Sequence, residues 1–67
     1  MVKKYFKLLV LFRNDDTWTR KSLLRRLKDE EIIDEAISLG YIEECGITDI
    51  GEPQYRITEL GIKVRDI

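Results

Sequence analysis

Only one small hydrophobic core can form in a chain of 67 residues, because so little apolar surface can be removed from water. Ordering the chain costs on the order of 100 kcal/mol of conformational entropy, so the net stability left by burial is only a few kcal/mol. Apolar residues make up 43% of the sequence and charged residues 37%, a balance typical of a globular domain. We therefore expect residues 1–67 to form a single domain that is too small for most enzymes.

The residue inventory excludes several catalytic and metal-binding chemistries. The sequence contains no histidine and a single cysteine, Cys45. A disulfide within the chain, a Cys/His zinc site and a Ser/His/Asp or Cys/His nucleophile are therefore excluded. Carboxylates four residues apart, such as Glu30 and Asp34, are expected on a convex helix face without a pocket, where acid–base catalysis has no support. We expect no enzymatic activity, cofactor, metal or small-molecule substrate.

The longest purely apolar run, Leu8 to Phe12, is far shorter than the 18 or more residues of a membrane span. The sequence also has no cleavable signal with a small-residue site. Together with the lone cysteine, these features predict a cytoplasmic protein with no membrane partner.

The net charge of −1 conceals a strong division of charge along the chain. Residues 1–28 contain nine basic and two acidic residues, a balance of +7, whereas residues 29–67 contain three basic and eleven acidic residues, a balance of −8. Such asymmetry indicates an electrostatic partner, whose nature depends on where the fold places each half.

The first third of the chain contains two apolar segments separated by a turn. In residues 2–13 the lysines fall within a stripe of about 100°, which predicts a helix with a wide apolar face. A buried strand over residues 6–12 is the competing interpretation, because short apolar runs do not distinguish the two. Residues 14–16 are turn formers, and residues 17–19 are a short segment with high β propensity.

Two further helices are expected in the middle of the chain. Thr19 can cap a helix over residues 20–27, with an apolar edge and otherwise basic faces. After a tight turn at residues 28–29, a third helix places its acids and Ser38 on one side and its apolar residues on the other, namely Ile32, Ile33, Ala36, Ile37 and Leu39. Gly40 ends this helix, since it can adopt positive φ.

A hairpin and a final helix complete the predicted order. Residues 41–45 and 54–58 alternate as strands, joined by a loop over residues 46–53 that contains the only proline. Residues 59–67 follow as a short helix. Its expected determinants are Thr58 as the N-cap, Leu60 and Val64 as inward apolar residues, and Gly61 as a weak point.

The residues that leave the third helix, Leu39-Gly40-Tyr41-Ile42, and those that leave the hairpin, Tyr55-Arg56-Ile57-Thr58-Glu59-Leu60-Gly61, resemble the pattern L-x-x-x-G-Y/L-I … Y-x-I/L-T-x-x-G of small bacterial, archaeal and phage winged helix-turn-helix regulators. The resemblance covers nearly the whole chain. It implies an α+β fold with a three-helix core, a two-stranded wing and a short C-terminal helix. It also implies a non-catalytic regulator that acts on DNA or a nucleoprotein complex.

In that superfamily the third helix usually enters the major groove, but here its outward face carries only acids and serine. Carboxylates approaching phosphates are repelled, so the usual docking is not expected. Nucleic acid is instead expected on the first two helices, in a reversed orientation. The candidate phosphate-binding residues are Lys3, Lys4, Lys7, Arg20, Lys21, Arg25, Arg26 and Lys28.

The alternative is a protein-interaction module, such as a phage- or virus-encoded inhibitor or adaptor, that docks its third helix on a basic partner. The candidate partner-binding residues are Trp18, Glu30, Glu31, Asp34 and Glu35. Simpler interpretations stay open: Trp18 as a core residue, and the basic residues of the second helix as a solvated face partly paired with the acids of the third. Homodimerisation through the first or last helix is a further alternative.

Overall fold

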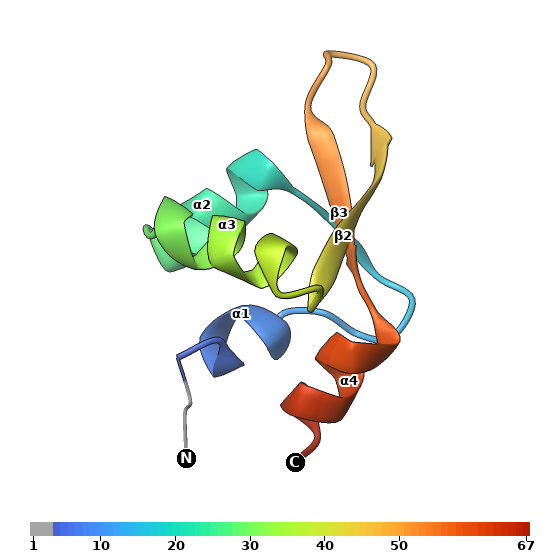
Figure 1. Cartoon of the computed structure of the whole chain (residues 1–67). Helices are drawn as coiled ribbons and strands as arrows, with labels where there is room; N and C mark the ends of the chain where they lie inside the picture. The colour runs from blue at the N-terminus through green and yellow to red at the C-terminus, as the bar shows by residue number, and fades with distance from the viewer. Residues whose placement is uncertain (1–3) are drawn as a thin grey trace.

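The computed structural model describes residues 4–67, so the expectations for Lys3 and for the start of the first helix lie outside the described residues. Residues 4–67 form a small α+β domain of four helices and one three-stranded antiparallel sheet (Figure 1). The elements are α1 (Phe6–Leu9), β1 (Thr17–Thr19), α2 (Arg20–Leu27), α3 (Glu30–Ser38), β2 (Ile42–Ile47), β3 (Pro53–Ile57) and α4 (Glu59–Arg65). The β2–β3 hairpin projects from one end of the molecule, and α1 and α4 lie at the other (Figure 1).

The prediction of a helix over residues 2–13 is wrong in extent, since α1 contains only four residues. The chain tightens after α1: the amides of Leu11 and Phe12 donate to carbonyls three residues back, at 3.2 and 3.1 Å. The carbonyls of Leu11 and Phe12 then accept tertiary donors, the indole N–H of Trp18 at 3.1 Å and the guanidinium of Arg65 at 2.8 Å. Tertiary hydrogen bonds thus replace those that would have continued the helix.

The predicted boundaries of the two central helices are confirmed. The Thr19 hydroxyl accepts the amide of Ser22 at 3.1 Å at the start of α2, and the Asp29 carboxylate accepts the amide of Ile32 at 3.3 Å at the start of α3. The tight turn between the two helices places Lys28 in the left-handed region, at φ 56°. Gly40 follows α3 at φ 79°, as its predicted role requires.

The sheet has the order β1-β3-β2, with Trp18 opposite Tyr55 and Ile42 opposite Ile57. The predicted strand bounds are wrong by one or two residues: β2 begins one residue later and extends to Ile47, and β3 begins and ends one residue earlier, so Gly46 and Pro53 belong to strands rather than to the loop. An irregularity between Glu44 and Gly46 accommodates the glycine, and proline is tolerated as the first residue of a strand.

The core lies between the helices and the sheet. Its buried residues are Leu8, Leu9, Phe12, Leu23, Ile33, Ala36, Ile42, Tyr55 and Ile57. The prediction that Leu39 belongs to the inward face of the third helix is wrong, since Leu39 lies past the end of α3 and is 47% exposed. The prediction that Leu60 faces inward is also wrong, since Leu60 is 48% exposed, whereas Ile62 and Val64 pack against the core. The cause is Gly61, which is buried beneath Tyr41 where a side chain has no room. Gly61 is therefore a close-packing position rather than a weak point of α4.

Candidate functional site

The clearest concentration of basic side chains on the described surface is on α2. Lys21 and Arg25 are exposed one turn apart on α2, and Lys28 is exposed in the tight turn that directly follows the helix. We call these three residues the cationic stripe. The opposite side of α2 carries buried Leu23 and half-buried leucines, so core packing forces the stripe outward. Within residues 4–67 none of the three side chains forms an ion pair.

Arg26 adds a fourth exposed charge beside the stripe. Its guanidinium carbon lies 5.7 Å from the ring centroid of Trp18, within the range of a cation–π interaction. Trp18 is half-buried, tilts against Phe12 with the ring centroids 6.3 Å apart, and donates its indole N–H to Leu11. Trp18 therefore packs against the core and holds Arg26, which agrees with its interpretation as a core residue.

Arg20 pairs with acids of α3 rather than projecting as a free cation. Its guanidinium lies 2.9 Å from the Glu30 carboxylate and 2.7 Å from that of Asp34, and it also donates to the hydroxyl of Tyr55 at 3.3 Å. The hydrogen bonds to Asp34 and Glu30 raise the pKa of Arg20. A predicted phosphate-binding residue and two predicted partner-binding residues thus neutralise one another. This occurs because the tight turn at residues 28–29 folds α2 back beside α3, which brings Arg20 next to Glu30 and Asp34.

Lys4 is paired in a similar way. Its ammonium lies 2.9 Å from the Glu35 carboxylate, which also accepts the hydroxyl of Tyr5 at 2.9 Å. The hydrogen bonds from Lys4 and Tyr5 lower the pKa of Glu35, and the same bonds raise the pKa of Lys4 and of Tyr5. These contacts join the segment before α1 to α3. Lys7, on α1, stays exposed without an ion pair among the described residues.

Replacing Glu35 by glutamine is expected to reduce the acid sensitivity of the fold. Because the folded state lowers the pKa of Glu35, its contribution is fully present above the ordinary glutamate pKa and is lost as the pH falls through the lowered value. The wild-type Tm should therefore fall more than that of Glu35→Gln between pH 6 and pH 3. Thermal unfolding followed by circular dichroism at both pH values measures this difference, with Glu31→Gln as control. Equal losses in wild type and Glu35→Gln would contradict the assignment.

The acidic face of α3 is less available than its composition suggests. Of the four predicted partner-binding carboxylates, Glu30, Asp34 and Glu35 bond basic side chains, and only Glu31 has no side-chain partner within residues 4–67. In the hairpin, Glu43 pairs with Arg56 at 2.7 Å, and Glu52 accepts the backbone amide of Lys21 at 3.3 Å. Most of these acids therefore connect elements of the fold.

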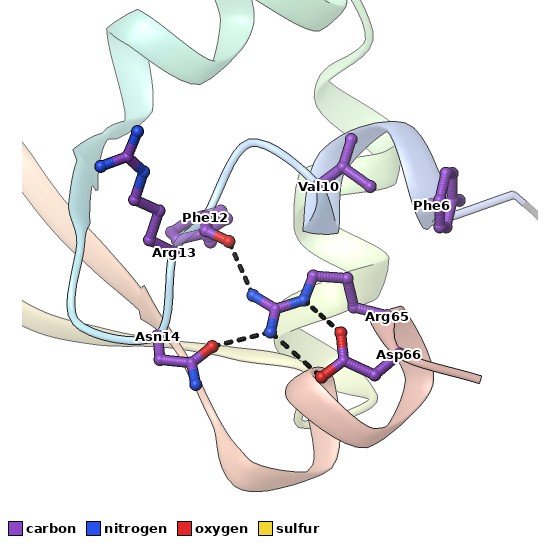
Figure 2. A pocket seen from close by; sticks show the side chains of 7 residues that line it. All are labelled: Phe6, Val10, Phe12, Arg13, Asn14, Arg65 and Asp66. Carbon is purple, nitrogen blue, oxygen red and sulfur yellow. Dashed lines mark hydrogen bonds and ion pairs between the residues drawn. The ribbon is translucent and has the colours of Figure 1, made fainter.

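Sequence analysis missed a cluster that joins α4 to the segment after α1 (Figure 2). The Arg65 guanidinium donates to the carbonyl of Phe12 at 2.8 Å, to the side-chain oxygen of Asn14 at 2.7 Å and to the carboxylate of Asp66 at 2.8 Å. The Asp66 hydrogen bond raises the pKa of Arg65 and lowers that of Asp66. The cluster borders an open hollow of about 590 Å³ that also exposes Phe6 and Val10. Phe6 and Val10 lie four residues apart, and this spacing was the available sequence signal for the exposed apolar wall of the hollow.

The described residues contain no group of three or more acidic or cysteine side chains placed to hold a metal ion. Among the same residues, no helix is long and apolar enough to cross a membrane. Comparisons with protein-family models, curated proteins and solved structures gave no match to this chain. The functional argument therefore depends on the geometry and charge of the surface.

Proposed function

We propose that the chain is a winged helix-turn-helix domain that acts as a small regulator and binds the phosphate backbone of nucleic acid through α2. The fold assignment is supported by the element order, by the tight turn between α2 and α3, and by the antiparallel hairpin that precedes α4. The sequence pattern around Gly40 and from Tyr55 to Gly61 supports it independently, because both glycines occupy positions where a Cβ would be strained or would clash.

The observation that carries the proposed function is the exposed cationic stripe with Arg26 beside it. Three exposed basic side chains project from α2 and a fourth, that of Lys28, from the turn after it, and none forms an ion pair among the described residues. Neutralisation of phosphates by such side chains supplies most of non-specific affinity for nucleic acid. We propose that these lysine and arginine side chains contact phosphates rather than base edges, so the expected binding has little dependence on sequence.

The proposed orientation differs from the usual one, in which the third helix lies in the major groove. The N-terminus of α3 carries Glu30 and Glu31 in its first turn, and the Asp29 carboxylate already accepts a free amide there. These charges counter the helix dipole that would otherwise attract a phosphate. In the proposed complex α3 faces away from the nucleic acid.

The test is fluorescence anisotropy with a labelled duplex of about 20 base pairs, which exceeds one helical turn. Three to four phosphate contacts give a slope of log K against log salt of about −3. Arg25→Gln is expected to weaken binding roughly tenfold at about 50 mM salt and to reduce the slope by about 1. Absence of binding at low salt would overturn the proposal.

Two control variants distinguish binding through α2 from binding through α4 or α3. Lys63→Gln removes the same charge from α4, where Lys63 is exposed, and is expected to leave affinity within about twofold of wild type. Glu31→Gln is expected to have an equally small effect if α3 faces away. A marked gain of affinity in Glu31→Gln would instead indicate the usual docking of α3.

A second candidate function is a protein-interaction module that uses the α3 face. The favouring observation is that Arg20 holds Glu30 and Asp34 in place while their side chains stay 61% and 60% exposed, with exposed Glu31 on the same helix. A preorganised acidic face of this kind suits a basic protein surface, as an inhibitor or adaptor would. Loss of a captured partner in Glu31→Lys, with retention in Arg25→Gln, would favour this function over the first.

A further inference from the structure

Trp18 is held in place by contacts from three other segments of the fold. Its indole N–H donates to the carbonyl of Leu11 at 3.1 Å, its ring centroid lies 6.3 Å from that of Phe12, and in the sheet it lies opposite Tyr55. Phe12 and Tyr55 are both buried in the core. The position of the ring is therefore defined by the core, although Trp18 itself is only half-buried on an edge strand of the sheet.

The side chain that lies over this ring is that of Arg26, on α2. Its guanidinium carbon is 5.7 Å from the ring centroid of Trp18. A guanidinium has five N–H donors in one plane, and contact with an aromatic face leaves them available to other partners. Two such donors can bond a phosphate together. The acids that shortly precede Trp18 in the chain, Asp15 and Asp16, form no ion pair with Arg26 among the described residues.

Arg26 differs from the other arginines that the structure describes. Three of them bond carboxylates within the chain: Arg20, Arg56 and Arg65. These bonds order the guanidinium groups but neutralise their charge. Arg13 and Arg25 are exposed, without an ion pair or a cation–π contact within residues 4–67. Arg26 combines an ordering contact with an uncompensated charge, because an aromatic ring carries no net charge.

We propose, on the basis of the function proposed for α2, that Trp18 is a positioning residue of the nucleic-acid site and holds the Arg26 guanidinium ready to bond a phosphate. An arginine side chain has several rotatable bonds, so ordering a free one on binding costs entropy. The contact with Trp18 restrains Arg26 beforehand, and less entropy is lost when the complex forms. Trp18 contributes to affinity only through Arg26, and it does not stack on a base.

The test is a double-mutant cycle measured by fluorescence anisotropy with the labelled duplex of about 20 base pairs, at about 50 mM salt. Trp18→Leu keeps an apolar side chain but removes the ring, and it should weaken binding about fourfold, the scale of an exposed cation–π interaction. Arg26→Gln should weaken binding roughly tenfold. In the Arg26→Gln background, Trp18→Leu should change affinity by less than about 1.5-fold, because the guanidinium that it positions is gone.

Arg25→Gln supplies the matched control background. Arg25 is the neighbouring arginine on the same helix, and it has no cation–π contact among the described residues. Trp18→Leu should therefore again weaken binding about fourfold in the Arg25→Gln background. Trp18→Phe keeps an aromatic face and loses the indole N–H, so it should bind within about twofold of wild type.

Far-UV circular dichroism checks that each variant is folded. If Trp18→Leu unfolds, Trp18→Tyr and Trp18→Phe replace it in both backgrounds, since both rings are weaker cation–π partners than indole. Their smaller losses should likewise disappear in the Arg26→Gln background.

The outcomes distinguish failure of this role of Trp18 from failure of the proposed function. Absence of duplex binding by wild type overturns the function of α2 itself. If wild type binds, an unchanged affinity in Arg26→Gln or in Trp18→Leu overturns the positioning role alone. So does an equal loss for Trp18→Leu with and without Arg26. Such an equal loss, if larger for a single strand of about 20 nucleotides than for the duplex, would indicate that Trp18 stacks directly on a base.

Discussion

Gly61→Ala is expected to destabilise the domain by about 3 kcal/mol, near the upper end of overpacking effects. A Cβ at this position would overlap the carbonyl oxygen of Tyr41 and would lie 2.7 Å from Cγ1 of Ile57 and 3.0 Å from the carbonyl carbon of Tyr41. Since two of these three atoms are backbone, relief requires α4 to move away from the start of β2. That movement would also disturb the Thr58 hydroxyl, which donates to the carbonyl of Tyr41 at 3.1 Å.

Whether Gly61→Ala stabilises or destabilises the domain shows which is larger, the gain in helix propensity or the loss from overpacking. In an exposed helix interior, replacing glycine by alanine stabilises by roughly 1 kcal/mol. Urea unfolding of wild type and Gly61→Ala, followed by circular dichroism, measures which contribution is larger. Gly46→Ala is the control, because its Cβ would meet only the end of the Gln54 side chain, at 3.4 Å. A variant Gly61→Ala as stable as wild type would contradict the close packing of α4.

Phe12→Ala is expected to destabilise the domain by about 3–5 kcal/mol, through lost burial and the cavity left behind. Phe12 is 1% exposed, packs beside Trp18 and lies in the core that joins α1, α2 and the sheet. A domain of this length has about 3–10 kcal/mol of total stability, so Phe12→Ala removes a large fraction of it and should unfold at a much lower urea concentration than wild type.

Phe6→Ala is the matched control for this prediction. It removes the same atoms from a position six residues earlier, but Phe6 is 46% exposed, so a loss of about 1 kcal/mol is expected. Near-UV circular dichroism of Trp18 and urea titration report the difference. Equal destabilisation by the two substitutions would show that the described burial of Phe12 is wrong.

Helix ends were predictable because their determinants are local. Thr19 and Thr58 each accept an amide three residues ahead, and Gly40 supplies positive φ directly after α3. The extent of α1 was not predictable, since the carbonyls of Leu11 and Phe12, just beyond the helix, accept side-chain donors from 7 and 53 residues further along the chain. The periodicity of apolar and basic residues predicts that a helix is present, but it does not show where hydrogen bonds from other parts of the fold end that helix.

The same distinction between local and tertiary determinants applies to the basic surface of α2. The apolar edge of the predicted helix over residues 20–27 left its other faces basic, and the structure exposes Lys21 and Arg25 on α2 and Lys28 in the turn after it. Spacing did not identify which charges are paired: Arg20 meets Asp34 14 residues away, and Lys4 meets Glu35 31 residues away. Ion pairs between elements depend on how the elements pack, which leaves Glu31 as the one predicted partner-binding carboxylate without a basic partner among the described residues.

The sequence by itself determined the element order, the helix caps and the sign of charge on each helix, because these depend on residues within a few positions of one another. The tertiary structure alone decided which face of α4 is buried, where α1 ends and which charges stay free. Those outcomes depend on contacts between distant segments: Gly61 beneath Tyr41, Arg65 on Phe12 and Arg20 between Glu30 and Asp34.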